Sequence, residues 1–271
     1  MNKKKFIDTE ELIRSKSPKL LKRLPRFLIR YIKRTIHEDD VNDFMSKYGH
    51  LEGEAFCSQV IESFNLDVEI RGEENIPLTG GVVFACNHPL GGMDAMAIVA
   101  GLKNIRKDIK FIVNDILLYL TNLKNLFIGV NKYGKNAASS LKIVDELFAS
   151  ENAVFIFPAG LVSRKKKGVI KDLEWKKTFI TRAKKHKRTV VPVHIEGELS
   201  NFFYRLSNFR SFLGIQTNIE LFYLSDETFN QKNKKIRITF GKPIPVEHFT
   251  HEKTDYEWAQ EIKAKVYALK E

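Results

Sequence analysis

Gly81-Val-Val-Phe-Ala-Cys-Asn-His-Pro-Leu-Gly-Gly-Met-Asp94 joins an uninterrupted apolar run to a polar loop that contains two glycines. Continuous apolar runs are typical of strands that are buried on both faces of a parallel sheet. Several such runs alternate with helical stretches, so we predict an α/β fold with a largely parallel, mixed sheet flanked by helices. The predicted strands are 82–86, 111–113, 126–130, 153–157, 190–195, 219–224 and 236–240, and the predicted helices are 95–102, 137–150, 175–186 and 255–269.

The first 65 residues have a different character. Residues 13–36 contain nine Lys or Arg and no acidic residue. Their apolar residues recur every three or four positions, which predicts a basic amphipathic helix, and Pro25 either kinks it or starts a second helix. A further helix is predicted at about 41–64. We expect an N-terminal helical extension at 1–65 that lies on an anionic membrane surface, followed by a catalytic domain at 66–271. The alternative is that the apolar stripe packs on the domain.

The composition limits the possible partners. The chain has 45 Lys and Arg against 33 Asp and Glu, a net charge of +12, which favours a polyanionic partner such as nucleic acid, an anionic membrane or an acidic carrier. No apolar stretch approaches about 18 residues, so we predict peripheral attachment, at the cytoplasmic face of the inner membrane. The two cysteines, Cys57 and Cys86, form no zinc-binding pattern, and we expect no bound metal.

The loop after the first buried strand contains the strongest candidates for catalysis. Histidine is a side chain that can take up and release a proton near neutral pH, and Asp94 lies six residues after His88, close enough to fold back onto its ring. A histidine that is oriented by a carboxylate can remove a proton from a hydroxyl nucleophile. On spacing alone, a purely structural hydrogen bond between the two side chains is equally well supported.

A second loop, Phe157-Pro-Ala-Gly-Leu-Val-Ser-Arg164, follows another predicted strand. Its proline and Gly160 favour a tight turn, and Arg164 can bind a phosphate or a carboxylate through two hydrogen bonds. The three lysines at 165–167 are better explained as a solvated run of charge. We therefore expect Arg164 to be functional.

Together these loops resemble the glycerolipid acyltransferase family. The shared features are an Asn-His pair that ends a strand, an Asp shortly after it, a Phe-Pro-x-Gly loop about 70 residues later and a Val-Pro-Val strand at 190–193. The resemblance covers about residues 68–243. It implies that His88 is the general base and that Asp94 orients it. It also implies substrate-binding roles for Asn87, Asn131, Lys132, Phe157, Pro158, Gly160, Ser163 and Arg164.

The chain departs from the motifs of the family at two places. The family motif is His-x4-Asp, whereas five residues separate His88 from Asp94 here, so the Gly91-Gly92 turn must restore the geometry. Ala159 replaces a glutamate that the family associates with acceptor binding. The pattern is more similar to the bacterial ornithine- and glycine-lipid O-acyltransferase branch, whose aminolipid acceptors would present a carboxylate to Arg164 and Lys132.

The resemblance implies an O-acyltransferase of membrane lipid synthesis. It would move a fatty acyl group from acyl carrier protein or coenzyme A to a lyso-aminolipid or lysophosphatidate, with no bound cofactor. Backbone N–H groups near Gly160 or Gly91-Gly92 would stabilise the oxyanion. The alternatives are a hydrolase with the same dyad and, with less support, a nucleic-acid-binding protein. The near-match to a P-loop at 129–135 lacks the required hydroxyl, because residue 136 is Asn.

Overall fold

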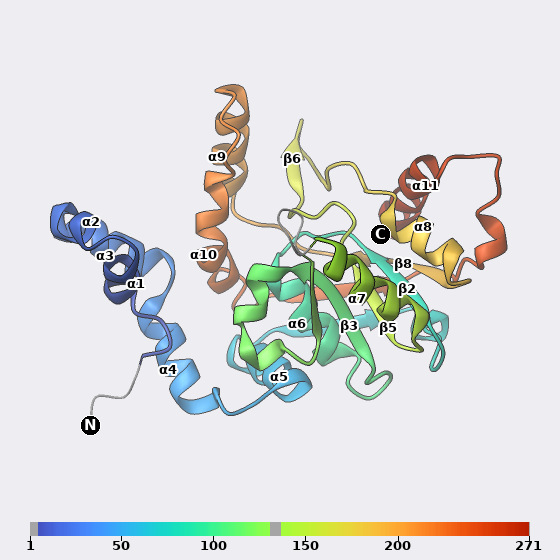
Figure 1. Ribbon diagram of the computed structural model, residues 1–271, viewed down its shortest axis with the longest axis horizontal. Coiled ribbons are helices and arrows are strands. Elements are labelled where there is room, and N and C mark those ends of the chain that lie inside the picture. Colours follow the sequence, from blue (N-terminus) through green and yellow to red (C-terminus); the bar gives the residue numbers. More distant parts are fainter. Residues whose placement is uncertain (1–4, 131–136, 271) are drawn as a thin grey trace. The chain divides into compact units, whose positions relative to one another are not determined.

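The computed structural model describes residues 5–130 and 137–270, with backbone only for 115, 116 and 137–140. The chain divides into two compact units, coloured by sequence in Figure 1. One, here called the helical unit, combines Met1–Leu51 with Ser200–Gln231. The other, the sheet unit, combines Glu52–Leu199 with Lys232–Glu271.

A seven-stranded sheet forms the centre of the sheet unit, in the order β1-β9-β8-β2-β5-β3-β4. All neighbouring strands are parallel except β8 and β9, which are antiparallel. The prediction of a largely parallel, mixed α/β sheet is therefore confirmed. The strands are β1 (Asp67–Arg71), β2 (Val82–Cys86), β3 (Ile109–Asn114), β4 (Phe127–Val130), β5 (Ala153–Ile156), β8 (Thr189–Ile195) and β9 (Lys235–Phe240).

Helices cover both faces of this sheet (Figure 1). The chain crosses from β2 to β3 in one direction and returns from β4 to β5 in the other, so right-handed crossovers place α6 and α7 on opposite faces. Val83 and Ala85 pack into a core with α7, α8 and α11, whereas Phe84 points the other way and stacks on Phe155, with ring centroids 4.4 Å apart. The helices are α5 (Gly53–Ser63), α6 (Gly92–Gly101), α7 (Ala137–Ala149), α8 (Thr178–Lys185) and α11 (Asp255–Ala268).

The carboxyl ends of β2 and β5 are neighbours, since Ala85 pairs with Ile156. After β2 the chain turns towards β3, and after β5 it turns towards β8 on the other side. This reversal is a topological switch point, where open parallel sheets place their ligand sites. The two loops that the sequence singled out therefore meet.

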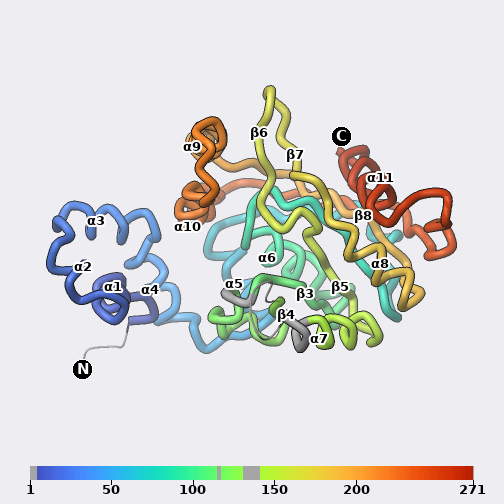
Figure 2. The backbone as a smooth tube through the Cα atoms, turned by 45° about the horizontal axis from the view of Figure 1, so that its top comes forward, coloured from blue at the N-terminus to red at the C-terminus, as the bar shows by residue number. Residues whose placement is uncertain are grey.

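A short hairpin interrupts the second loop. β6 (Arg164–Lys166) and β7 (Val169–Lys171) pair antiparallel and project from the sheet unit (Figure 2). Lys167 and Gly168 connect them, both with positive φ (48° and 80°), which is the geometry of a tight hairpin turn. Short 3₁₀ segments join other elements at Glu73–Asn75, Asp115–Tyr119, Thr121–Leu123 and Val246–His248.

The helical unit consists of α1 (Thr9–Lys16), α2 (Pro18–Arg23), α3 (Arg26–Thr35), α4 (Glu38–Tyr48), α9 (Asn201–Phe212), η4 (Ile219–Tyr223) and α10 (Leu224–Phe229). Ser17 caps α2, and Pro25 directly precedes α3, so this proline starts a helix and does not kink one. The His37 ring binds Asp40 and Asp226, each at 3.0 Å, and stacks on Phe229. These contacts join segments that lie far apart in the sequence.

Two predicted elements were wrong. The predicted strand 219–224 is η4 and the start of α10, because Glu220 is buried against Arg210 (2.8 Å) while Ile219 and Phe222 are exposed. In a buried central strand, the apolar side chains of Ile219 and Phe222 would be buried and the charged Glu220 would not. The predicted helix 41–64 is two helices, α4 and α5, separated by residues 49–52, and α5 begins at Gly53, whose φ of 54° does not continue a preceding helix. Helix α9 had no counterpart in the prediction.

No helix in the described parts of the chain is long and apolar enough to cross a membrane.

Candidate active site

His88 and Asp94 lie against each other at the carboxyl end of β2. The loop leaves β2 at Cys86 and enters α6 at Gly92, with Gly91 at a φ of 69°. This turn accommodates five intervening residues and brings His88 Nδ1 to 2.8 Å from Asp94 Oδ2. The backbone N–H of Leu90 also donates to both carboxylate oxygens, at 3.2 and 3.0 Å.

Electrostatics define the roles of the two side chains. Asp94 is completely buried, and this burial raises the pKa of its carboxyl group, while the hydrogen bond from His88 opposes the rise. A carboxylate can only accept hydrogen bonds, so Nδ1 of His88 carries the proton that it donates to Asp94. Nε2 is then the nitrogen with a free lone pair, and it is the one that can act as a base.

The imidazole is fixed in orientation yet remains accessible. Its ring stacks on Phe157, with centroids 4.1 Å apart and planes at 21°. Phe157 follows β5, so the second loop supplies one wall of the site. The His88 side chain keeps 18% of its surface exposed, enough for a substrate to reach the ring.

Asn87 holds the loop in place from the other side. Its amide donates to the carbonyl of Ile195 (2.8 Å) and accepts from the N–H of the same residue (2.7 Å). This buried pair of hydrogen bonds ties the loop to the end of β8.

Asp172 was missed by the sequence analysis. Its Oδ1 accepts from the backbone N–H of His88 (3.2 Å) and the hydroxyl of Ser163 (2.6 Å), and its Oδ2 accepts from the indole of Trp175 (2.9 Å). The N–H of Ser163 in turn donates to the His88 carbonyl (2.8 Å). Asp172 therefore joins the two loops, but in the sequence it is only a lone acidic residue after a run of cations.

The structure gives contacts for three of the remaining predicted residues and leaves two outside the described part of the chain. Arg164 is buried on β6 and donates to the carbonyl of Val162 (2.6 Å). The N–H of Gly160 donates to the Phe157 carbonyl (2.9 Å), so this N–H already has a partner within the second loop. Pro158 accepts from the N–H of Lys176 (3.2 Å). Asn131 and Lys132 lie outside the described residues.

A cleft of about 230 Å³ adjoins the loop. Asn87 and Pro89, the two neighbours of His88, line it together with Ser163, His194, Tyr267 and Lys270. His194 is buried, and its Nδ1 has no hydrogen-bond partner within the described residues. No pattern in the sequence points to His194 or Lys270, because only the fold brings them next to the loop.

Comparison with known proteins identifies the family. A family model described as "Acyltransferase" matches residues 11–271. A lyso-glycine lipid O-acyltransferase of Bacteroides thetaiotaomicron is 43% identical over 266 residues, which is 97% of each chain. One of the same name from Phocaeicola vulgatus is 42% identical over 97% of this chain and 95% of its own. The chain belongs to the acyltransferase family.

The fold of this chain is also found in a solved acyltransferase structure. The crystal structure of the 1-acyl-sn-glycerophosphate acyltransferase PlsC from Thermotoga maritima superposes with a TM-score of 0.53. It covers 80% of this chain and 78% of its own, at 23% identity. Within residues 5–130 and 137–270, no group of three His, Cys, Asp or Glu side chains is arranged to bind a metal ion.

The burial of His194 in this acyltransferase predicts a loss of stability in acid. Burial lowers the pKa of His194 to about 4, below its ordinary value of 6.5. Between these values the unfolded chain binds a proton that the folded protein does not, so the free energy of unfolding falls as the pH decreases. We expect His194 to account for a loss of about 3 kcal/mol between pH 7 and pH 4.

Urea denaturation at several pH values measures this effect. His194→Gln, whose side chain stays neutral, should lose less stability than the wild type over this range. Identical pH dependence in the two proteins would show that His194 titrates normally when folded.

Proposed function

We propose that this acyltransferase moves a fatty acyl group from a thioester of acyl carrier protein or coenzyme A to the hydroxyl of a lyso-lipid with a glycine head group. The observation that carries the proposal is the 2.8 Å contact between His88 and a fully buried Asp94, beside a cleft. The names of the two relatives at 42–43% identity support the choice of acceptor.

The mechanism is a single displacement. Asp94 keeps the proton of His88 on Nδ1, and Nε2 removes the proton of the acceptor hydroxyl. The acceptor oxygen forms a bond to the thioester carbonyl carbon as the carbon–sulfur bond breaks. The imidazolium then gives its proton to the departing thiolate, which leaves the enzyme unchanged and yields an ester and a free thiol.

Replacement of His88 tests the base. We expect His88→Ala to lower kcat by about 10²–10⁴-fold, because no other group removes the hydroxyl proton. Asp94→Asn should also lower kcat, since an amide can orient the ring with the wrong nitrogen protonated. The assay follows ester formation by mass spectrometry with each donor and a panel of lyso-lipids.

His251→Ala is the matched control, because His251 is an exposed histidine outside the site. It should retain wild-type turnover. Residual activity of His88→Ala within tenfold of the wild type would contradict the mechanism. Release of free fatty acid without any acceptor would instead favour the hydrolase alternative.

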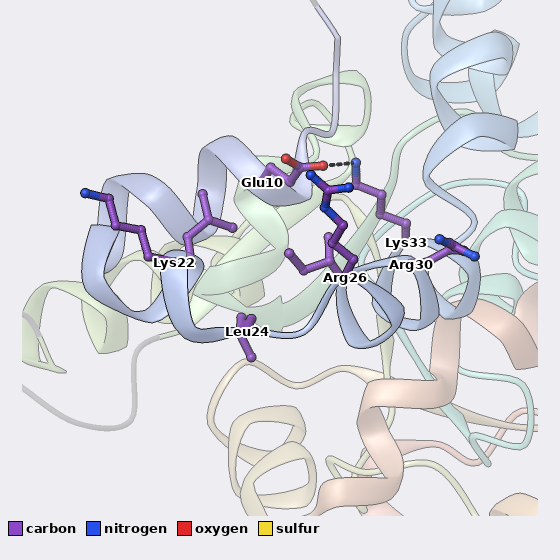
Figure 3. A pocket seen from close by; sticks show the side chains of 8 residues that line it. Glu10, Lys22, Leu24, Arg26, Arg30 and Lys33 are labelled. Atoms are coloured by element: carbon purple, nitrogen blue, oxygen red, sulfur yellow. Dashed lines mark hydrogen bonds and ion pairs between the residues drawn. The ribbon is translucent and has the colours of Figure 1, made fainter.

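The helical unit supports a peripheral position at the cytoplasmic face of the cell membrane. Phe27 and Tyr31 are 71% and 45% exposed, so the apolar stripe of α3 is not packed away. Basic side chains surround a cavity of about 500 Å³ in this unit (Figure 3). Lys33 binds Glu10 at 2.6 Å, whereas Lys22, Arg26 and Arg30 have no ion-pair partner in residues 5–130 and 137–270.

The free cations suit anionic lipid head groups. In Figure 3, Lys22 and Arg30 point outward on either side, while Arg26 lies nearer Glu10. Each basic residue near an anionic leaflet contributes about 1 kcal/mol to binding. Exposed aromatic side chains next to these cations can insert into the apolar part of a bilayer. Binding to the phosphates of a nucleic acid would not need this apolar contact.

Charge reversal tests this attachment. The combined change Lys22→Glu, Arg26→Glu and Arg30→Glu should weaken co-sedimentation with phosphatidylglycerol-containing vesicles by about two orders of magnitude or more. The matched control reverses three exposed lysines of the sheet unit, Lys103, Lys107 and Lys124, and should bind far better.

Equal losses in the two variants would show that only net charge matters. Tighter binding to duplex or single-stranded nucleic acid than to vesicles, measured by gel shift, would contradict the membrane role.

A further inference from the structure

The cleft beside the catalytic loop contains a cation without a partner. Lys270 follows α11, and within the described parts of the chain its ammonium group makes no ion pair and no hydrogen bond. Of the two glutamates in the same lining, Glu196 binds Arg237 through two contacts of 2.9 and 3.0 Å, and neither glutamate pairs with Lys270 in the part of the chain that the structure describes. Lys270 is therefore the cation of this lining that is available to an anionic ligand.

The neighbouring polar group is neutral and can hydrogen-bond. His194 lies on β8, with its ring 5.8 Å from that of Tyr267 on α11. Its Nδ1 is buried without a partner among the described residues, which costs stability unless a ligand or a water satisfies it. Since burial lowers the pKa of His194, the ring adds no charge at neutral pH.

The cleft lies within reach of the chemistry. Asn87 and Pro89, which line it, are the residues on either side of His88, and consecutive Cα atoms are about 3.8 Å apart. A lipid whose head group enters the cleft would thus hold its hydroxyl close to the catalytic loop. A glycine that is attached to a lipid through its nitrogen keeps a free carboxylate, a group that an ammonium binds well.

We propose that Lys270, with His194 beside it, binds the carboxylate of the acceptor. This contact would set the enzyme's preference for lipids whose amino-acid head group carries a free carboxylate. This inference rests on the proposed function. It assigns the role to Lys270, just after α11, and to His194 on β8, and not to Arg164, whose guanidinium donates to the carbonyl of Val162.

The first test separates binding from catalysis. Equilibrium dialysis would measure the affinity of the wild type, Lys270→Gln and Lys270→Arg for N-decanoylglycine and for its methyl ester. We expect Lys270→Gln to bind the acid about tenfold more weakly, Lys270→Arg to recover most of the affinity, and the ester to bind all three equally. No binding of the acid to the wild type, or an equal loss for acid and ester, would overturn the proposal whether or not the enzyme acylates this lipid.

The second test uses turnover with the lyso-glycine lipid. Lys270→Gln should raise KM about tenfold with kcat within about twofold, because Lys270 contacts the head group and not the reacting atoms. A loss of kcat alone, or an equal Lys270-dependent effect on lysophosphatidate, would contradict a carboxylate site. If the wild type acylates no lyso-lipid while the dialysis result holds, the proposed function fails and the carboxylate site stands.

Discussion

The hydrogen bond between His88 and the buried carboxylate of Asp94 is the interaction on which the site depends. Placing a carboxylate in the interior is costly unless its oxygens are satisfied. Here the Leu90 N–H and the His88 ring supply the donors, and both come from the loop that Asp94 itself anchors. The arrangement requires the left-handed turn at Gly91, so the extra residue between His88 and Asp94 is absorbed by backbone geometry, and the contact between the two side chains is kept.

The sheet topology explains why the rest of the site gathers at this point. β2 and β5 are adjacent and their chains turn in opposite directions, so the loop with His88 meets the loop with Phe157. Asp172 joins these loops through the His88 backbone and the Ser163 hydroxyl. The fold also brings the end of β8 and the end of α11 next to Asn87. His194 and Lys270 therefore line a cleft together with Asn87.

How far the sequence predicts this molecule depends on the range of the interactions. β2 and β5 were predictable because each is an uninterrupted apolar run. His88 and Asp94 were predictable because one local loop carries both. The segment 219–224 was mispredicted because Glu220 is buried against Arg210 of α9, a partner that no pattern in the segment reveals. Asp172, His194 and Lys270 were missed because only the fold brings them to the loop that carries His88.

The protonation of His88 is the most direct test of this account. Nitrogen NMR of protein labelled at its histidines, with the His88→Gln spectrum for assignment, reports which ring nitrogen carries the proton. The geometry predicts a proton on Nδ1 and a bare Nε2 at a pH where the enzyme is active. A proton on Nε2 with a bare Nδ1 would contradict it, because the lone pair of the ring would then face Asp94 and not the acceptor hydroxyl.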